Sequence, residues 1–274
     1  MSIPVNALNP VCVSGMATMS WTLTDEIAMY RRAGAGLIGL QASKVAATPV
    51  PEVAELLAVH DVRLGYLVHP FSAHPDDESA WEEQISALAV AVQNAHALGS
   101  DLVYMTSGPS GQLEWEDAAE RLADRVAPVV RQARHLGVRL AVENTLPVKC
   151  DISFTHSARE AFALADRLGI GVCLDLYCCW QERGLGGLVK DQLARIELLQ
   201  LSDFVVGTST FPNRWVPGDA DLPLERLLAT ALNAGYDGVV DVELLGPAIE
   251  AEGAESAVTR SVAWMRRQIA AANA

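Results

Sequence analysis

The sequence lacks the long apolar runs and the leader-like segment that mark membrane and secreted proteins. No uninterrupted apolar segment approaches the roughly 18 residues that a membrane-spanning helix needs. The first residues, Met1–Asn9, do not combine a basic segment with a hydrophobic stretch, as a secretory leader does. We therefore expect a cytoplasmic protein that neither crosses nor binds a membrane.

Positive charge is also scarce, and the basic residues do not cluster. The chain has 20 Lys and Arg residues against 34 Asp and Glu residues, which gives a formal net charge of −14. A field of this sign repels the phosphate backbone of nucleic acids, so we expect a small-molecule substrate and no nucleic-acid partner. The five cysteines form no C-x-x-C pair, which is typical of a reducing compartment rather than of a disulfide framework.

The sequence does contain a regular alternation of short aliphatic runs and longer segments of helical period. This alternation predicts repeated strand–helix units and a parallel sheet. We expect eight strands, at Val11–Ser14, Gly36–Gln41, Arg63–His69, Asp101–Ser107, Val138–Asn144, Gly171–Tyr177, Glu197–Asp203 and Val239–Leu244. We expect helices at Asp25–Ala33, Glu78–Leu98, Glu116–Leu136, Ser157–Leu168, Leu224–Ala234 and Ala254–Ala270. Five of them are followed by a glycine that can form a left-handed cap, at Gly34, Gly99, Gly137, Gly169 and Gly235.

Eight parallel strands with intervening helices close most naturally into a barrel. Half of the residues are hydrophobic, which is enough for one large aliphatic core. No G-x-G-x-x-G follows the first predicted strand, which weakens the alternative of an open dinucleotide-binding sheet. Because no linker or low-complexity tract divides the chain, we predict an α/β protein with a single (β/α)8 TIM barrel domain over residues 1–274.

Polar residues stand at the ends of the last four predicted strands, where a barrel carries its catalytic groups. Glu143, Asp175 and Glu243 each close an aliphatic run, and Gln200 and Asp203 lie in the remaining one. A buried carboxylate costs several kcal/mol unless it meets a cation or strong donors. Three such groups indicate a shared divalent ion, and an all-oxygen set favours Mn2+ or Mg2+. The alternative is that each acid binds an Arg, a Lys or a backbone amide of its own.

Five motifs give the chain its resemblance to a known family. They are VEN at Val142–Asn144, CLDLY at Cys173–Tyr177, QLSD at Gln200–Asp203, VPGDADLPL at Val216–Leu224 and GYDGVVDVELLGP at Gly235–Pro247. With these motifs the chain resembles the xylose-isomerase-like TIM barrels of sugar phosphate isomerase and epimerase type. That family includes ketose epimerases, hydroxypyruvate isomerases, inosose dehydratases and endonuclease IV type enzymes. The resemblance covers nearly the whole chain, and the last two motifs are the most distinctive.

The resemblance implies that Glu143, Asp175, Gln200 and Glu243 hold one divalent metal ion. Relatives usually have a histidine at the third position, so Gln200 would supply a neutral carbonyl oxygen instead. This change shifts the preference further toward Mn2+ or Mg2+, with Co2+ or Zn2+ as alternatives. Cys178 stands where many relatives have a histidine that contacts substrate. These two departures leave open a degenerate barrel that has kept the fold and lost the chemistry.

The chemistry that the resemblance implies is isomerisation or epimerisation of a polyhydroxy carbonyl, sugar-like substrate through an enediolate. Glu143 and Glu243 would form the acid/base pair, because similar epimerases use the corresponding glutamates as ligands and as proton shuttles. The same intermediate would expel a good leaving group from the next carbon. A metal-dependent lyase or dehydratase, acting on a keto-sugar or an oxidised glycoside, is therefore the alternative.

Four further side chains are candidate substrate contacts. Lys44 follows the second predicted strand, and His69 ends the third. Arg214 lies in the long loop before the PGDAD turn, where relatives place a substrate-binding arginine. Trp180 could form one wall of a pocket. Each of the four also has a plainer interpretation as a surface cation or a packing residue, and a homo-oligomer remains possible.

Overall fold

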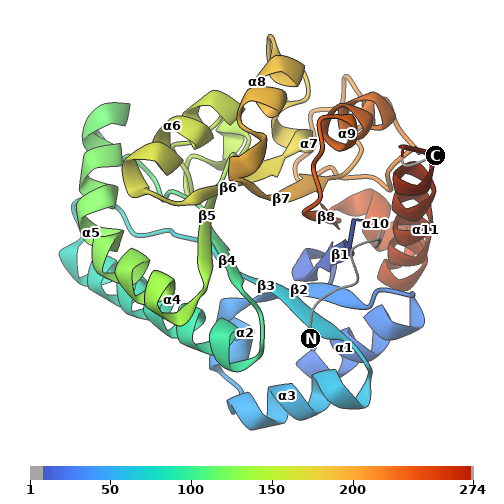
Figure 1. Cartoon of the computed structure of the whole chain (residues 1–274), viewed down its shortest axis with the longest axis horizontal. Coiled ribbons are helices and arrows are strands. Elements are labelled where there is room, and N and C mark those ends of the chain that lie inside the picture. Colours follow the sequence, from blue (N-terminus) through green and yellow to red (C-terminus); the bar gives the residue numbers. More distant parts are fainter. Residues whose placement is uncertain (1–8, 273–274) are drawn as a thin grey trace.

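The computed structural model of the chain describes residues 9–272, and its strands form one closed parallel barrel. Each strand pairs with the next along the chain, and β8 closes the ring by pairing with β1 (Figure 1). The predicted (β/α)8 fold is therefore confirmed. The strands are β1 (Val11–Ser14), β2 (Leu37–Gln41), β3 (Arg63–His69), β4 (Leu102–Met105), β5 (Arg139–Glu143), β6 (Gly171–Asp175), β7 (Ile196–Leu201) and β8 (Val239–Val242).

The segment that we examined for a leader, Met1–Asn9, lies outside the described residues except for Asn9. The single domain over residues 1–274 therefore stays a prediction, although every described strand belongs to the one barrel.

Six helices correspond to the predicted amphipathic segments and cover the outside of the barrel (Figure 1). They are α1 (Leu23–Arg32), α4 (Glu78–Ala97), α5 (Trp115–Leu136), α6 (Ala158–Leu168), α9 (Leu224–Asn233) and α11 (Ala254–Ala272). The sequence pattern missed five others, which are α2 (Ala42–Ala46), α3 (Val50–Val59), α7 (Leu176–Cys179), α8 (Leu185–Asp191) and α10 (Pro247–Glu252). Four of these have seven residues or fewer, too few for a helical period to be visible. Three short 3-10 turns are η1 (Gly15–Thr18), η2 (Pro147–Lys149) and η3 (Leu193–Arg195).

The strands are buried on both faces, which explains why their sequences are nearly continuous in apolar residues. A large cluster joins strand residues to residues of the surrounding helices, and it forms the layer outside the barrel. A smaller cluster contains strand residues alone and fills the barrel interior. Its members are Cys12, Leu37, Tyr66, Val68, Leu102, Tyr104, Ala141, Cys173 and Leu198. Alternate residues of each strand thus pack inward and outward, as the pleat requires.

Local signals at the ends of the elements largely behave as predicted. All five glycines expected to terminate helices have a positive φ, between 67° and 98°. Several strands end earlier than predicted, and β6 shows the reason. The carboxylate of Asp175 accepts the backbone N–H of Tyr177 at 3.0 Å, so it ends the strand and caps the short helix α7.

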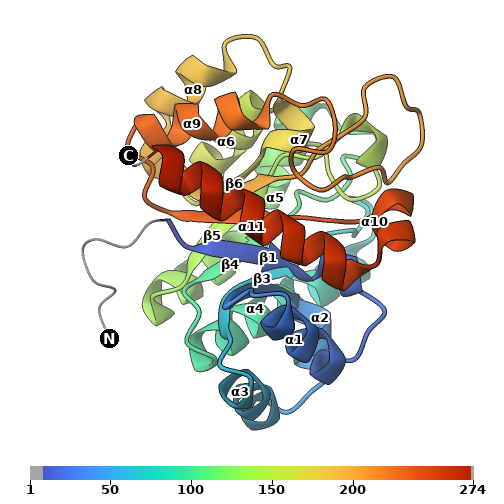
Figure 2. The same cartoon turned by 90° about the vertical axis from the view of Figure 1, so that its right-hand side faces the viewer.

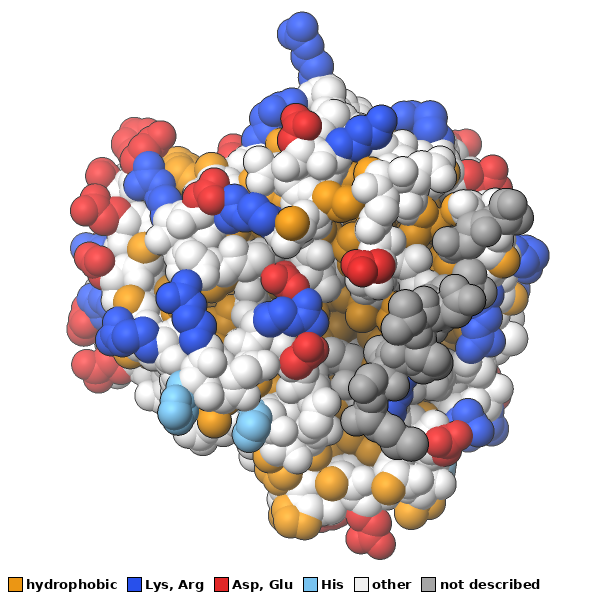
Figure 3. All heavy atoms as spheres, viewed as in Figure 1, with side chains coloured by type: hydrophobic (Ala, Val, Ile, Leu, Met, Phe, Trp, Pro, Cys, Tyr) orange, Lys and Arg blue, Asp and Glu red, His pale blue; other side chains and the backbone are white. Residues whose placement is uncertain are grey.

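All eight strands run in the same direction, so their carboxyl ends share one rim. Figure 2 shows that the loop after β7 and helix α10 lie at this end, away from the end at which the chain enters β1. Figure 3 shows the other face, where Lys and Arg side chains are interspersed with Asp and Glu and form no broad patch of one sign. Among residues 9–272, no helix combines the length and the hydropathy needed to span a membrane.

A buried ion pair fixes the loop that follows β1. Glu26 on α1 is fully buried, and its carboxylate accepts hydrogen bonds from Thr18 Oγ1 at 2.6 Å and Lys44 Nζ at 2.7 Å. Lys44 Nζ also donates to the Thr18 carbonyl oxygen at 2.7 Å. Burial raises the pKa of Glu26, against the opposing effect of the hydrogen bonds from Lys44 and Thr18. Lys44 therefore holds η1, and with it the first loop of the rim, against α1.

We predict that Lys44→Met lowers the free energy of unfolding by about 3 kcal/mol, because it leaves the Glu26 carboxylate buried without its cation. Urea denaturation at neutral pH measures this loss. The matched control is Arg31→Met, whose partner Asp61 is exposed, so that the loss should stay below about 1 kcal/mol. Equal losses in the two variants would show that the Lys44–Glu26 pair contributes no more to stability than an exposed ion pair.

Candidate active site at the carboxyl-terminal rim

The four predicted ligand residues lie at the carboxyl ends of the last four strands. Glu143 and Asp175 are the last residues of β5 and β6, Gln200 lies in β7, and Glu243 directly follows β8. Asp175 and Gln200 are register partners across β6 and β7. All four side chains are buried, so neighbouring protein groups must supply most of the hydrogen bonds and charge stabilisation that water would otherwise provide.

Arg214 lies among these acids. Its Nη2 donates to Asp175 Oδ2 at 2.7 Å and lies 3.6 Å from Glu243 Oε1. Its Nη1 donates to Ser202 Oγ at 2.8 Å, and its guanidinium stacks 4.2 Å from the centre of the Tyr177 ring. Burial alone lowers the pKa of Arg214, but Asp175 and Glu243 outweigh it and hold the pKa well above the ordinary value. Arg214 is therefore a permanent cation within the site.

The two glutamates differ from ordinary surface carboxylates. Burial raises the pKa of Glu143 well above its usual range, and the charges of Glu243 and Asp175 raise it further. Burial also raises the pKa of Glu243, while Arg214 and a hydrogen bond from the Gln200 side chain act in the opposite direction. Both side chains line the same cavity. Two carboxyl groups at one cavity, both with raised pKa values, are suited to accept and return protons.

The side chains of Arg214, Cys178 and Asn144 hold Asp175 in addition to its position in β6. Its Oδ2 accepts from Arg214 and from the Cys178 thiol, whose Sγ lies 3.1 Å away. Asn144, the residue after Glu143, brackets the Asp175 backbone, because its Oδ1 accepts the Asp175 N–H and its Nδ2 donates to the Asp175 carbonyl, each at 3.0 Å. The sequence analysis assigned no role to Asn144. Its place directly after Glu143 in the VEN motif was the signal that could have identified it.

The loop that carries Arg214 is organised by Asp203. The carboxylate of Asp203 accepts four backbone N–H groups at 2.9 to 3.1 Å, from Phe204, Gly218, Ala220 and Leu222. Its backbone also pairs with Trp215 in an isolated antiparallel bridge. These bonds fold the PGDAD turn back onto the end of β7 and bring Arg214 over the barrel. Asp203 thus acts on the backbone of the loop.

The amide of Gln200 has one end bound and one end free. Its Nε2 donates to Asp241 Oδ2 at 2.9 Å, while its Oε1 is buried without a hydrogen-bond partner. Glu243 Oε2 is another buried oxygen without a partner. Burial raises the pKa of Asp241 to about 7, against the hydrogen bonds from Gln200, Cys12 and Tyr66, which lower it.

These oxygens provide a test of whether the site fits a metal ion. Carboxylate and amide oxygens are the donors that hard divalent ions prefer, and two of them lack any partner. Within residues 9–272, however, no three acidic, histidine or cysteine side chains converge closely enough to form a metal cluster. Nη2 of Arg214 contacts both Asp175 and Glu243, so an internal cation already pairs with two of the acids. The oxygen donors therefore suit a metal ion, and two of the acids that would bind it, Asp175 and Glu243, also contact Arg214.

A cavity of about 420 Å³ opens above the acids. Its polar part includes Glu143, Glu243, Arg214, Cys178 and Tyr104. Gln41, Thr106, Thr145 and Lys149 add further polar groups, and the apolar part of the wall includes Met16, Met19, Leu146, Ile152, Phe211, Pro212 and Leu245. Met19 and Phe211 are also among the most exposed large hydrophobic residues of the described chain. The cavity thus combines a charged floor with an apolar wall.

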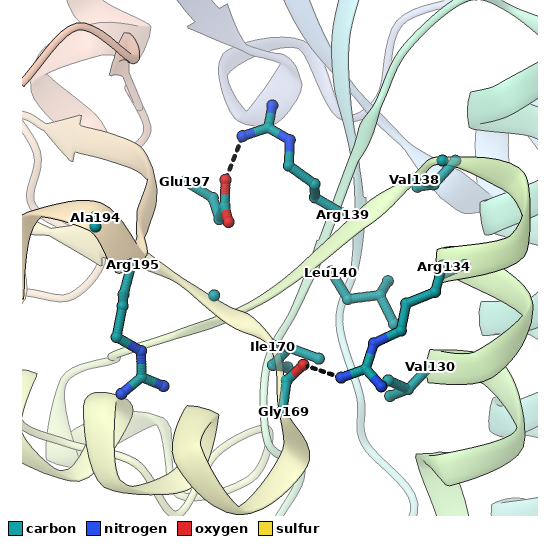
Figure 4. Close-up of a pocket in the computed structure, with 13 residues that line it drawn as sticks. Val130, Arg134, Val138, Arg139, Leu140, Gly169, Ile170, Ala194, Arg195 and Glu197 are labelled. Atoms are coloured by element: carbon teal, nitrogen blue, oxygen red, sulfur yellow. Dashed lines mark hydrogen bonds and ion pairs between the residues drawn. The ribbon is translucent and has the colours of Figure 1, made fainter.

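A second cavity, of about 400 Å³, lies at the other end of the barrel, where β5, β6 and β7 begin. Three arginines line it, and each has a partner. Arg134 donates to the Gly169 carbonyl and Arg139 pairs with the Glu197 carboxylate (Figure 4). Arg195 pairs with the Asp166 carboxylate. Helices α5 and α6 end here, and basic side chains stabilise the carbonyl ends of helices. These arginines therefore have structural roles, which leaves the rim cavity as the candidate active site.

Three predicted substrate contacts lie outside the rim cavity. His69 ends β3 but is buried against Phe71, with the ring centroids 5.7 Å apart. Lys44 is engaged with Glu26, and Trp180 packs against the outer core cluster. Of the predicted site residues, the structure brings together Glu143, Asp175, Gln200, Glu243 and Arg214 at the rim. A role for His69, Lys44 or Trp180 in substrate binding stays a prediction, and each would have to leave its present contacts.

These features define a (β/α)8 barrel with a buried acidic site at its catalytic rim. The sequence profile described as xylose isomerase-like TIM barrel matches residues 27–268, and the chain belongs to this family. An inosose isomerase from Halalkalibacterium halodurans is 26% identical over 190 residues, which cover 66% of this chain and 66%, just under two thirds, of that relative.

Solved structures show the same fold. D-psicose 3-epimerase from Clostridium cellulolyticum H10, solved with D-tagatose, matches with a TM-score of 0.79 at 15% identity, over 95% of this chain and 99% of that one. The IOLI protein, solved with a bound zinc atom, matches with a TM-score of 0.78 at 17% identity, over 95% of this chain and 98% of that one. At such identities the likeness concerns the fold alone.

We predict that His69 stays neutral well below its ordinary pKa. Burial lowers the pKa of His69 to about 4, although hydrogen bonding with Gln84 opposes the shift. The unfolded chain binds this proton near pH 6.5, so the stabilisation is complete above that pH and is lost as pH falls toward 4. Between pH 7 and pH 4.5 the wild type should lose about 2 to 3 kcal/mol more unfolding free energy than His69→Gln. Urea denaturation at both pH values measures the difference, and identical pH dependence in the two proteins would contradict the prediction.

Proposed function

We propose that the protein is a divalent-metal-dependent isomerase or epimerase of a polyhydroxy carbonyl, sugar-like substrate. The observation that carries this proposal is the pair of buried glutamates, Glu143 and Glu243, which share one cavity and have raised pKa values. The names of similar proteins, an inosose isomerase and a D-psicose 3-epimerase, support the same reaction class.

The proton transfer uses the positions of the two glutamates. β5 and β8 are not neighbours in the barrel, so Glu143 and Glu243 approach the cavity from different sides. One glutamate takes the proton from the carbon between the carbonyl and a hydroxyl, and the C–H electron pair moves onto the carbonyl oxygen to give a planar enediolate. The other glutamate then protonates the enediolate, and an oxygen electron pair re-forms a carbonyl group. Protonation of the same carbon from the opposite face gives epimerisation, and protonation of the neighbouring carbon gives isomerisation. Their raised pKa values make both groups suitable to hold the proton in transit.

Arg214 and the four predicted ligands have distinct parts in this scheme. Arg214 pairs with Asp175 and offers a fixed positive charge next to Glu243, which would stabilise a developing oxyanion. A divalent ion held by Glu143, Asp175, Gln200 and Glu243 would supply a Lewis acid for the substrate oxygens. Mn2+ or Mg2+ suits the all-oxygen donor set best, and Co2+ or Zn2+ is the alternative. The zinc atom of the IOLI protein supports a metal in this fold.

One observation favours a second candidate, a lyase or dehydratase that uses the same acids. The apolar wall formed by Met16, Met19 and Phe211 offers room for a substituent beyond the polyhydroxy part of the substrate. If that substituent leaves readily, the enediolate expels it and an unsaturated product forms. Product analysis with a panel of keto-sugars and oxidised glycosides separates the two candidates, because only elimination yields the unsaturated compound.

We predict that Glu143→Gln and Glu243→Gln each lower kcat by about 100-fold or more, because each removes a positioned acid or base and keeps an oxygen. The assay is turnover of ketose epimers, and in deuterated water the product should carry deuterium next to the carbonyl. The control is Glu197→Gln, a glutamate at the opposite end of the barrel that pairs with Arg139, and its activity should be unchanged. Full activity in both rim variants would exclude the assigned acid/base pair, and the absence of deuterium would indicate a shielded proton or a hydride shift.

We predict that Gln200 binds the metal through Oε1. Gln200→Ala should weaken Mn2+ binding by about 10-fold or more, whereas Gln200→His should bind a metal and shift preference toward Zn2+ or Co2+, since imidazole is the softer ligand. Isothermal titration calorimetry with each metal measures both effects. Gln84→Ala is the control, because Gln84 is a glutamine on the surrounding helix α4, whereas Gln200 lies in β7 beside the acids. Unchanged metal affinity and preference in both Gln200 variants would remove Gln200 from the ligand set.

A further inference from the structure

Tyr104 is a buried tyrosine of β4 whose hydroxyl the proposed mechanism does not use. It belongs to the cluster that fills the barrel interior, and it also lines the rim cavity. Its neighbour Tyr66 on β3 belongs to the same cluster but does not line that cavity. The two rings pack together with their centroids 5.1 Å apart. The deep end of the cavity is therefore formed in part by one of two packed tyrosines.

The hydroxyl groups of the two tyrosines differ in what they bind. The Tyr66 hydroxyl donates to Asp241 Oδ2 at 3.1 Å. The Tyr104 hydroxyl has no hydrogen-bond partner among residues 9–272, yet it is not one of the atoms that the fold encloses without a partner. A buried tyrosine usually has a partner for its hydroxyl. The Tyr104 hydroxyl is therefore open to the cavity, where a ligand can accept its hydrogen bond.

The topology of the barrel places Tyr104 near both glutamates of the proposed acid/base pair. Tyr104 is the register partner of Ala141 on β5, which lies two residues before Glu143 on the same face of that strand. In the closed ring β4 is opposite β8, the strand that Glu243 follows. Arg214 pairs with the acids that follow β6 and β8. The cavity thus has a cationic donor near β6 and β8 and an uncharged donor at β4.

The electrostatic environment keeps Tyr104 in its protonated form. Burial raises the pKa of Tyr104 well above its ordinary range, and the charges of Glu143 and Glu243 raise it further. Tyr104 therefore stays a neutral hydrogen-bond donor throughout the physiological pH range. A fixed donor of this kind, in a site that excludes most water, stabilises negative charge that develops during a reaction.

We infer that the Tyr104 hydroxyl donates a hydrogen bond to the substrate oxygen on which negative charge develops as the enediolate forms. The inference rests on the proposed function, since this charge arises only if a glutamate removes a proton from carbon. The C–H electron pair then moves onto the carbonyl oxygen, and the hydrogen bond from Tyr104 strengthens as the charge grows, while the phenol keeps its proton. Such a donor stabilises the transition state more than the bound ketone.

The first test compares Tyr104→Phe with Tyr66→Phe, which each remove one hydroxyl from one of the two packed rings. Tyr104→Phe should lower kcat for ketose epimers by about 100-fold and leave KM nearly unchanged, the usual result of losing a transition-state donor. Its Tm should not fall, because its hydroxyl has no protein partner to lose. Tyr66→Phe should show the reverse, an unchanged kcat and a lower Tm, since Asp241 loses a buried donor.

Three results of this comparison would overturn the inference. A wild-type kcat in Tyr104→Phe would show that the hydroxyl does not contact the reacting oxygen. A raised KM with an unchanged kcat would assign the hydroxyl to ground-state binding of substrate. A fall in kcat accompanied by a fall in Tm as large as that of Tyr66→Phe would assign it a structural role.

The second test needs no turnover. Threonohydroxamate is a polyhydroxy hydroxamate whose planar, oxygen-rich end resembles an enediolate. Its affinity for the wild type and for both variants is measured by titration calorimetry in buffer that contains Mn2+. Tyr104→Phe should weaken its binding by about 100-fold, the same factor as the loss in kcat, because a transition-state mimic uses the same hydrogen bond. Tyr66→Phe should bind it as the wild type does, and equal affinities in wild type and Tyr104→Phe would contradict the inference.

The two tests distinguish failure of the inference from failure of the proposed function. A wild type that binds the hydroxamate through Tyr104 and turns over no ketose would contradict the isomerase function and support Tyr104 as the donor to an oxyanion. Conversely, ketose turnover that survives in Tyr104→Phe would contradict the inference and leave the proposed function intact. A wild type that neither binds the hydroxamate nor turns over ketoses would overturn both.

Discussion

The rim site depends on a single electrostatic constraint, which is that three acids are buried close together. Glu143, Asp175 and Glu243 are buried, and each carboxylate would be costly to ionise there without a cation. Within the described residues, Arg214 is the cation that pairs with these acids, and its Nη2 contacts both Asp175 and Glu243. Burial raises the pKa values of both glutamates against the opposing charge of Arg214, so the loop that carries Arg214 must be held firmly.

The support for Arg214 comes from residues that do not line the cavity. Asp203 binds four backbone N–H groups of the loop, and Asn144 fixes the backbone of Asp175 from the adjacent strand. On the opposite side of the barrel, the Lys44–Glu26 pair fixes the loop after β1, which contributes Met16 and Met19 to the cavity wall. The cavity is thus shaped by buried polar contacts behind it, whose loss would displace loops rather than remove a reacting group.

The sequence predicted the barrel and the acids for one physical reason, which is that strands buried on both faces are aliphatic and a polar residue at their end is conspicuous. It could not predict the place of Arg214, because a loop of more than ten residues separates it from β7 and its position depends on Asp203. Lys44 was a candidate substrate contact because it follows the second predicted strand. Its pairing with Glu26 could not be foreseen, because the charge pattern alone does not reveal that Glu26 lies on the buried side of a helix. The metal ligation of Gln200 stays a prediction. The period of two in VVDVE, however, already places Asp241 and Glu243 on one face of β8.

The unsatisfied atoms of the site all have the same chemical character. In the described part of the chain, three buried oxygens without a hydrogen-bond partner belong to the contiguous residues Gln200, Asp241 and Glu243. Gln200 Oε1 is an acceptor, and so are the two carboxyl oxygens in their ionised form, so a donor or a cation would complete this part of the site. A folded protein keeps such unsatisfied groups mainly where function requires them. A substrate hydroxyl or a hard divalent ion suits Glu243, which lines the rim cavity, whereas Gln200 and Asp241 are register partners one layer deeper in the barrel.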